Sequence, residues 1–89
     1  MKVIKITAMW CSACIIMNNL WNDILKDYNI ETESYDYDFD EEIVKSFNPG
    51  DILPIFIFKD DDKEIGRIQG EINKDELISY MKGLGVINE

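Results

Sequence analysis

Positive charge is scarce in this sequence of 89 residues. Nine lysines and arginines stand against 18 aspartates and glutamates, which leaves a net charge of −9. A protein that binds nucleic acid through the phosphate backbone needs lysine and arginine to replace counterions. The acidic excess therefore argues against nucleic-acid partners and against anionic membrane surfaces. It either keeps the protein soluble or favours basic partners.

Long apolar runs are also missing. No stretch approaches the ~18 residues that a membrane span needs. Residues 1–7 alternate lysine with valine and isoleucine, unlike the apolar segment of a signal peptide. These absences predict a cytoplasmic protein without a membrane partner. Because cytoplasmic thiols are kept reduced, a close pair of cysteines there is more often catalytic or metal-binding than structural.

Histidine is absent, and the chain has only two cysteines. Two cysteines cannot build the multi-bridge framework of small secreted proteins. They could hold zinc only with two further ligands, which would have to be carboxylates or come from a second subunit. We therefore expect no metal and no bound cofactor. The remaining alternatives are a chemical role for the two thiols and inert burial of both.

The size and composition suit one folded domain. The sequence is 46% hydrophobic and 30% charged, and 89 residues are too few for two domains. We expect a single domain over residues 1–89. Its core must be small, so each apolar segment is needed to form it.

Hydrophobic periodicity predicts the elements along the chain. Strands are expected where β-branched or alternating apolar residues gather, and helices where apolar residues recur every three or four positions. The predicted strands cover residues 2–7, about 31–37, 55–58 and 64–69. The predicted helices cover about 11–28, a short segment after 40 and a segment after 73.

The first two helices are predicted from their apolar faces. Asp40 can cap the short helix, whose inner face would contain Ile43, Val44 and Phe47. The long helix carries a broad apolar stripe, typical of a helix packed on a sheet, which consists of Ala13, Ile16, Met17, Leu20, Trp21, Ile24, Leu25 and Tyr28.

The last helix begins at a signature like a capping box, formed by Asn73 and Glu76, and would end at Gly83 or Gly85. The element order is therefore β-α-β-α-β-β-α, which predicts an α/β domain with a four-stranded mixed sheet flanked by three helices. The first three strands are joined by helical crossovers and so could be parallel. The last strand follows a short turn and should be antiparallel.

The two cysteines occur in the run Trp10-Cys11-Ser12-Ala13-Cys14, between the first strand and the first helix. On the first turn of a helix this spacing brings the sulfurs within bonding reach. Cys11 would lie at the helix N-terminus, where unpaired N–H groups and the macrodipole lower the pKa of its thiol. The pattern predicts dithiol–disulfide exchange, in which Cys11 attacks a disulfide and the more buried Cys14 resolves the mixed disulfide.

The residues around this pair resemble the thioredoxin family. Trp10-Cys11-x-x-Cys14 matches the family's Trp-Cys-x-x-Cys active site, and residues 52–59 resemble the segment in which a cis-proline precedes a central strand. Residues 65–70 are similar to the glycine-bearing strand that closes the site, and residues 73–81 to the C-terminal helix. The resemblance runs from Val3 over nearly the whole chain. It implies a thioredoxin-like fold of glutaredoxin size, without the N-terminal strand and helix of full-length thioredoxins.

The resemblance also assigns roles around the two cysteines. It implies that Pro54 is cis and lies against the sulfurs. An X-Pro bond adopts cis at modest cost, and proline has no N–H to compete for the site. The backbone of Leu53 would pair with an extended substrate strand, and Trp10, Pro54 and Gly70 would form a flat apolar rim. Alternatively, Pro54 is only a proline at the start of a strand and Gly70 an ordinary turn glycine.

Three positions depart from the family pattern. Ser12-Ala13 replaces the Gly-Pro between the cysteines, a dipeptide that tunes the reduction potential. Lys5 stands where thioredoxins usually carry a buried aspartate, which is thought to accept a proton from the resolving cysteine. Lys5 could favour thiolates, pair with an acid such as Glu33, or extend its amine to solvent. Asn19 replaces a common helix-kinking proline.

Three functions are compatible with these residues. The preferred one is a monomeric electron carrier that reduces disulfide-containing proteins and is itself reduced by a flavin-dependent thioredoxin reductase. The second is a glutathione-dependent, glutaredoxin-like enzyme, although Gly70-Glu71 supplies one glycine where glutaredoxins typically carry two, and an acidic surface would repel glutathione. The third is a non-catalytic module that holds peptides along the edge at Leu53 and Pro54.

Two further sets of residues are interpreted as structural. One is an aromatic set expected in the core or at partly covered positions, namely Trp21, Tyr35 and Tyr37. The other is an acidic set that alternates along the second predicted strand, namely Asp36, Asp38 and Asp40. The glycine and distant glutamate of a calcium-binding loop are missing, so these aspartates are interpreted as a solvated strand face.

Overall fold

The structure, a computed structural model, describes residues 1–87. Residues 88 and 89, the last two of the predicted domain, lie outside the described residues. Within the described part, no helix is long and apolar enough to cross a membrane. The elements follow the predicted order, and they are β1 (Lys2–Thr7), α1 (Ser12–Asp27), β2 (Glu31–Asp36), α2 (Glu41–Ser46), β3 (Ile55–Asp60), β4 (Lys63–Gln69) and α3 (Lys74–Leu84).

The four strands form one mixed sheet in the order β2-β1-β3-β4. β1 and β2 are parallel, and β4 is antiparallel to β3, as predicted. The expectation that β3 could also be parallel is wrong, because β3 runs antiparallel to β1. The short helix α2 and the loop after it remain near the end of the sheet where β2 finishes. β3 therefore starts beside the end of β1, where Ile55 pairs with Ile6.

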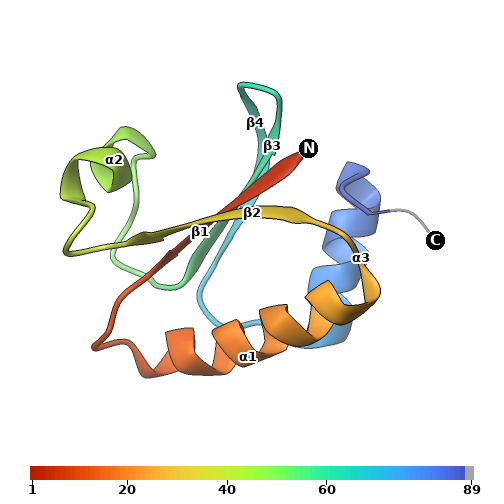
Figure 1. Ribbon diagram of the computed structural model, residues 1–89, viewed down its shortest axis with the longest axis horizontal. Coiled ribbons are helices and arrows are strands. Elements are labelled where there is room, and N and C mark those ends of the chain that lie inside the picture. Colours follow the sequence, from red (N-terminus) through yellow and green to blue (C-terminus); the bar gives the residue numbers. More distant parts are fainter. Residues whose placement is uncertain (88–89) are drawn as a thin grey trace.

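Helices cover both faces of the sheet, with α1 and α3 on one side and α2 toward the other (Figure 1). The two central strands are therefore buried on both faces, which explains the unbroken apolar run of β3. The core beneath α1 and α3 contains Val3, Met17, Trp21, Ile24, Ile30, Phe56, Phe58, Leu77, Met81 and Ile87. A second core, which we call the cysteine cluster, contains Ile4, Ile6, Ala8, Cys11, Cys14, Val44, Leu53, Ile55 and Ile57.

The apolar stripe of α1 is narrower than predicted. Met17, Trp21 and Ile24 are fully buried, but Ile16 is 52% exposed, so its assignment to the packed face is wrong. Successive residues of a helix differ by about 100° in direction, which turns Ile16 away from the sheet. In α2 only Val44 is buried, and Ile43, expected on the inner face, is 44% exposed. A helix of six residues is too short to bury a wide face.

The caps of the two later helices differ in outcome. Asn73 accepts a hydrogen bond from the backbone N–H of Glu76 at 2.8 Å, and α3 ends at Gly85, which adopts a left-handed φ of 80°. Both features were predicted. Asp40 occupies the position before α2, but its side chain does not cap that helix. Its carboxylate instead accepts a hydrogen bond from the backbone N–H of Asp36 at 2.8 Å.

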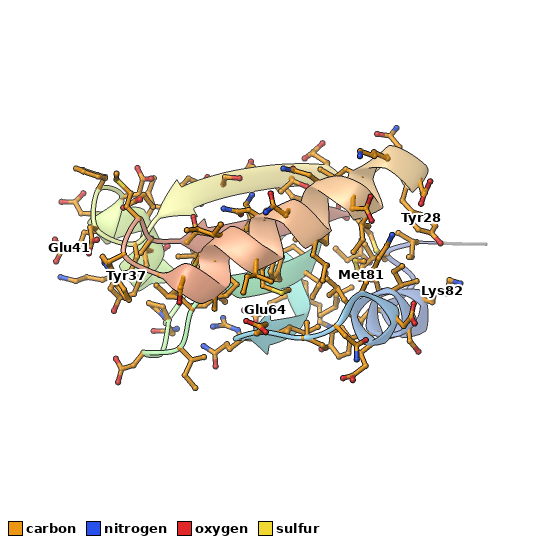
Figure 2. The ribbon with its side chains drawn as sticks, turned by 90° about the horizontal axis from the view of Figure 1, so that it is seen from below. Tyr28, Tyr37, Glu41, Glu64, Met81 and Lys82 are labelled. Carbon is orange, nitrogen blue, oxygen red and sulfur yellow. A yellow bond between two sulfur atoms is a disulfide. The ribbon has the colours of Figure 1, made fainter. Side chains whose placement is uncertain are left out.

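The acidic segment after β2 is a turn and not a strand face. β2 ends at Asp36, whose carboxylate accepts hydrogen bonds from the N–H groups of Asp38 and Phe39 at 2.9 and 3.0 Å. Phe39 is 80% exposed. The interpretation of Asp38 and Asp40 as a solvated strand face is therefore wrong, because side-chain hydrogen bonds to the backbone turn the chain after Asp36. Figure 2 shows Tyr37 and Glu41 together at the end of the molecule where α1 begins.

Candidate active site

Cys11 and Cys14 lie where β1 leads into α1. Cys11 is the residue that caps the helix, and its backbone N–H donates to the carbonyl of Ala8 at 3.2 Å. The two cysteines form a disulfide with their Cα atoms 5.2 Å apart. The exposed fraction is 8% for Cys11 and 1% for Cys14. The predicted difference in burial is therefore present, although both cysteines are largely buried.

The sulfur of Cys11 is held by the first turn of α1. It accepts a hydrogen bond from the backbone N–H of Cys14 at 3.1 Å. The first turn of this helix contains no acidic residue. A thiolate at Cys11 would therefore meet a backbone donor and the positive end of the helix dipole, with no carboxylate of that turn to repel it. Both effects favour the charged, nucleophilic form.

Leu53, Pro54 and Gly70 come together beside the cysteine cluster. Leu53 belongs to that cluster, and the Leu53–Pro54 peptide bond is cis, as the resemblance predicted. The N–H of Gly70 donates to the carbonyl of Pro54 at 2.8 Å. Gly70 has a φ of 85°, and a Cβ there would lie 3.1 Å from Ile52. Backbone conformation and close packing thus both favour glycine at position 70.

Trp10 is exposed directly before the cysteines. Its side chain is 64% accessible, and its indole N–H donates to the carboxylate of Asp38 at 2.7 Å. The ring also makes an edge-to-face contact with Tyr37, with the ring centroids 6.3 Å apart. Two further apolar side chains are exposed, Met9 beside Trp10 in the sequence (80%) and Ile52 next to Gly70 (60%). Trp10 therefore presents an exposed ring next to the cysteines, with the carboxylate of Asp38 bound to its indole N–H.

Sequence reasoning missed the contacts of Asp38 and Tyr37 with Trp10. The regular alternation of acids and aromatics suggested a strand, so the turn that places both side chains against Trp10 was not foreseen. The signal available was the pair Asp36 and Asp38, since an aspartate often accepts hydrogen bonds from N–H groups two and three residues later.

Lys5 is partly buried on β1, on the same strand face as Val3, which packs in the core beneath α1 and α3. One of the alternatives considered for Lys5, an ion pair with Glu33, is wrong. Lys2 instead forms the ion pair with Glu33 at 3.0 Å, and this hydrogen bond lowers the pKa of the Glu33 carboxyl. Burial lowers the pKa of the Lys5 amine, and no ion pair of Lys5 occurs among residues 1–87.

The two residues between the cysteines differ in environment. Ser12 is exposed at the first position of α1, and Ala13 packs partly against the cysteine cluster. Neither brings a charge to the disulfide. Within residues 1–87 no group of three or more cysteine, aspartate or glutamate side chains is arranged to hold a metal ion.

The chain belongs to the thioredoxin family, because the sequence model of that family, described as Thioredoxin, matches residues 1–83. The paired cysteines and the family together indicate a thiol–disulfide oxidoreductase. A comparison with curated proteins finds no match for this chain.

Solved thioredoxin structures have the same fold. Thioredoxin-2 of the malaria parasite, described as a component of its protein secretion machinery, superposes with a TM-score of 0.83 at 24% identity, over 91% of this chain and 80% of that one. Thioredoxin of Fasciola hepatica gives 0.81 at 26% identity, over 91% and 77%. Oxidized mitochondrial thioredoxin 3 of Saccharomyces cerevisiae gives 0.78 at 27%, over 91% and 76%. The architecture is therefore the thioredoxin fold.

Proposed function

We propose that this protein reduces disulfide bonds in other proteins, with Cys11 as the nucleophile and Cys14 as the resolving cysteine. The observation that carries the proposal is the difference between the two sulfurs. Cys11 is at the helix N-terminus with a backbone donor on its sulfur, whereas Cys14 is nearly inaccessible. A substrate disulfide can therefore reach Cys11 first.

The exchange takes two steps. The Cys11 thiolate attacks one sulfur of the substrate disulfide, so a mixed disulfide forms, the substrate bond breaks and the released substrate thiolate takes up a proton. The Cys14 thiolate then attacks the Cys11 sulfur and releases the second substrate thiolate. The substrate gains two electrons, and this protein is left with the disulfide that the structure contains.

The surroundings of the pair support a protein substrate. Trp10, Pro54 and Gly70, together with Ile52, offer a mostly apolar rim, and Leu53 offers a backbone edge for an extended chain. A cytoplasmic flavin-dependent thioredoxin reductase would return the disulfide to the dithiol. The protein would act as a monomer, without metal or cofactor.

Lys5 is proposed as a positioning residue for this reaction. It is a half-buried cation on the strand that leads to the cysteines, and it forms no ion pair with the acidic side chains of residues 1–87. A positive charge there favours the dithiolate over the disulfide, because the disulfide carries no charge. Replacement of Lys5 by methionine should therefore make the reduction potential more negative, and replacement by arginine should restore it.

Serine variants test the assignment of the two sulfurs. With a disulfide-bonded test protein, Cys14→Ser should accumulate one covalent mixed disulfide at Cys11, visible by mass spectrometry. Cys11→Ser should form no adduct and catalyse no reduction, and the double variant serves as the blank. Full activity of the Cys11→Ser protein would disprove the assignment.

The direction of electron flow is tested by equilibration in glutathione redox buffers. A single two-electron transition near about −270 mV would support a reductant, whereas a value between about −180 and −120 mV would indicate an isomerase or oxidase. If no intramolecular disulfide forms in any buffer, the redox proposal fails and the non-catalytic peptide-binding module takes its place.

A further inference from the structure

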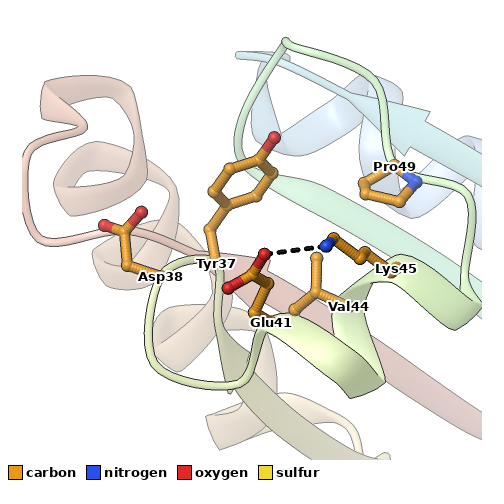
Figure 3. Close-up of a pocket in the computed structure, with 6 residues that line it drawn as sticks. All are labelled: Tyr37, Asp38, Glu41, Val44, Lys45 and Pro49. Carbon is orange, nitrogen blue, oxygen red and sulfur yellow. Dashed lines mark ion pairs between the residues drawn. The ribbon is translucent and has the colours of Figure 1, made fainter.

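A cleft lies beside the candidate active site, on the side of Trp10 that faces α2. It has a volume of about 280 Å³ and is lined by Tyr37, Asp38, Glu41, Val44, Lys45 and Pro49. Figure 3 shows the Tyr37 ring on one side, Pro49 on the other, and Glu41 with Lys45 between them. We call this the α2 cleft. None of its residues was predicted to belong to the site.

Two residues connect the α2 cleft to the disulfide. Asp38 lines the cleft and accepts the hydrogen bond of the Trp10 indole at 2.7 Å. Tyr37 also lines it and contacts the Trp10 ring. Trp10 immediately precedes Cys11. A substrate segment whose disulfide reacts at Cys11 could therefore place a neighbouring side chain in the cleft.

The walls of the cleft suit a long basic side chain. Val44, Pro49 and the ring of Tyr37 provide apolar surface for a methylene stem, and the carboxylates of Asp38 and Glu41 line the same cleft. The one cation in the lining, Lys45, is paired with Glu41 at 2.8 Å, and this hydrogen bond lowers the pKa of the Glu41 carboxyl. Asp38 forms no ion pair with any lysine or arginine of residues 1–87. Its charge remains available to a partner.

We infer that the α2 cleft receives a lysine or arginine side chain of the protein whose disulfide is being reduced, an inference that rests on the proposed function. The stem packs against the apolar walls of the cleft, and the cation pairs with Asp38. The net charge of −9 attracts a basic partner over longer distance. The substrates are therefore proteins with a basic residue close to the reactive disulfide.

The test compares rates for matched peptide disulfides. In one series a single arginine is moved through the positions beside the reacting cysteine, and in the other glutamine replaces it. The readout is the second-order rate constant for the arginine peptide divided by that for the matched glutamine peptide. A variant that changes the reactivity of Cys11 itself affects both rate constants, so this change cancels in the ratio. For the best position we expect a ratio of roughly two to five in low salt, decreasing toward one in high salt.

Three variants locate the effect. Asp38→Asn should bring the ratio close to one. Lys45→Gln should raise it, because Glu41 is then free to pair with the arginine. Asp62→Asn removes the same charge from the β3–β4 turn, near the strand ends opposite to Cys11, and should leave the ratio unchanged.

The outcomes separate the two proposals. If neither peptide series is reduced, the proposed function fails. If both series are reduced at equal rates by the wild-type protein, only the α2 cleft inference fails. An equal decrease of the ratio in Asp38→Asn and Asp62→Asn would also overturn it, since overall charge and not the cleft would then select the substrate.

Discussion

The backbone N–H of Cys14 donates a hydrogen bond to the sulfur of Cys11 at 3.1 Å, so one cysteine caps the helix that contains the other. This contact distinguishes the two sulfurs, because only that of Cys11 lies at the positive end of the helix. After reduction the same N–H would face a thiolate, and a hydrogen bond to a charged acceptor is about twice as strong as one between neutral groups.

The first prediction concerns the acidity of Cys11. In the Cys14→Ser protein, the pKa of the remaining thiol should be below the ~8.5 of a free cysteine, because the helix N-terminus stabilises its thiolate. The rate of alkylation by iodoacetamide, measured against pH, gives this pKa. The same variant unfolded in urea is the control and should titrate normally. Equal midpoints in the folded and unfolded protein would contradict the capping argument.

The second prediction concerns Lys5 and pH. Burial lowers the pKa of its amine in the folded protein, so the unfolded chain binds the proton more tightly. The cost in folding free energy of burying the charged amine is present in full at pH values below the pKa of Lys5 in the folded protein. It disappears as the pH rises from there toward about 10.5, the pKa in the unfolded chain. Lys5→Met should therefore increase the free energy of unfolding at neutral pH.

Urea unfolding of the wild type and of Lys5→Met at pH 7 and pH 10 measures this difference. The gain in stability should be smaller at pH 10. The control is Lys63→Met, which removes an exposed lysine at the start of β4 and should give no comparable gain in stability at pH 7. If Lys5→Met lowers the free energy of unfolding at pH 7, the packing of the lysine stem stabilises the protein by more than the burial of its charge destabilises it.

The sequence predicted the elements that are determined by local signals. Three local patterns each favour a single type of secondary structure. They are the β-branched run of β1, the unbroken apolar run of β3 and the capping pair of α3. The helix that contains Cys14 was predicted from the apolar periodicity that follows the cysteines. These segments were predicted closely, and the structure places Cys11 and Cys14 at the start of α1 with their sulfurs bonded, as predicted.

The features that were missed depend on how segments meet. β3 runs antiparallel to β1 because the loop after α2 enters the sheet beside the end of β1. No local sequence pattern indicates this point of entry. Asp38 was assigned to a strand because its neighbours alternate, whereas hydrogen bonds to Asp36 end the strand before it. Glu33 was a reasonable partner for Lys5, but the side chain of Lys2 reaches it instead.

The third prediction compares the two tryptophans. Trp21 is fully buried, packs on Phe56 with centroids 5.0 Å apart, and donates to the hydroxyl of Thr32 at 3.2 Å. Its replacement by alanine should cost about 3–5 kcal/mol, which is a large part of the stability of a small domain. Trp21→Phe keeps most of the packing and should cost less.

Trp10→Phe is the matched control for Trp21→Phe, because it changes an exposed indole and loses only a surface hydrogen bond. Its effect on stability should remain within about 0.5 kcal/mol. Urea unfolding followed by far-ultraviolet circular dichroism measures all three variants. Similar losses for Trp10→Phe and Trp21→Phe would contradict the burial that separates the two residues.

The fourth prediction concerns Gly66, a residue of β4 beside α3. A Cβ at this position would lie 2.5 Å from the hydroxyl oxygen of Tyr80 and 3.0 Å from Leu84. The Tyr80 ring packs on Phe58 with centroids 5.6 Å apart, so a movement that makes room for the Cβ would weaken that contact. Gly66→Ala should therefore destabilise the protein by about 1–3 kcal/mol, the usual cost of overpacking.

A double-mutant cycle isolates the contact between positions 66 and 80. Tyr80→Phe removes the hydroxyl oxygen, so Gly66→Ala should cost clearly less in that background. Gly83→Ala is the control, since nothing lies within 4 Å of a Cβ there and alanine is the better helix former by about 0.5–1 kcal/mol. It should leave the protein as stable or more so. If Gly66→Ala costs the same with tyrosine or phenylalanine at position 80, the loss arises elsewhere, and the packing of α3 against β4 is looser than this contact requires.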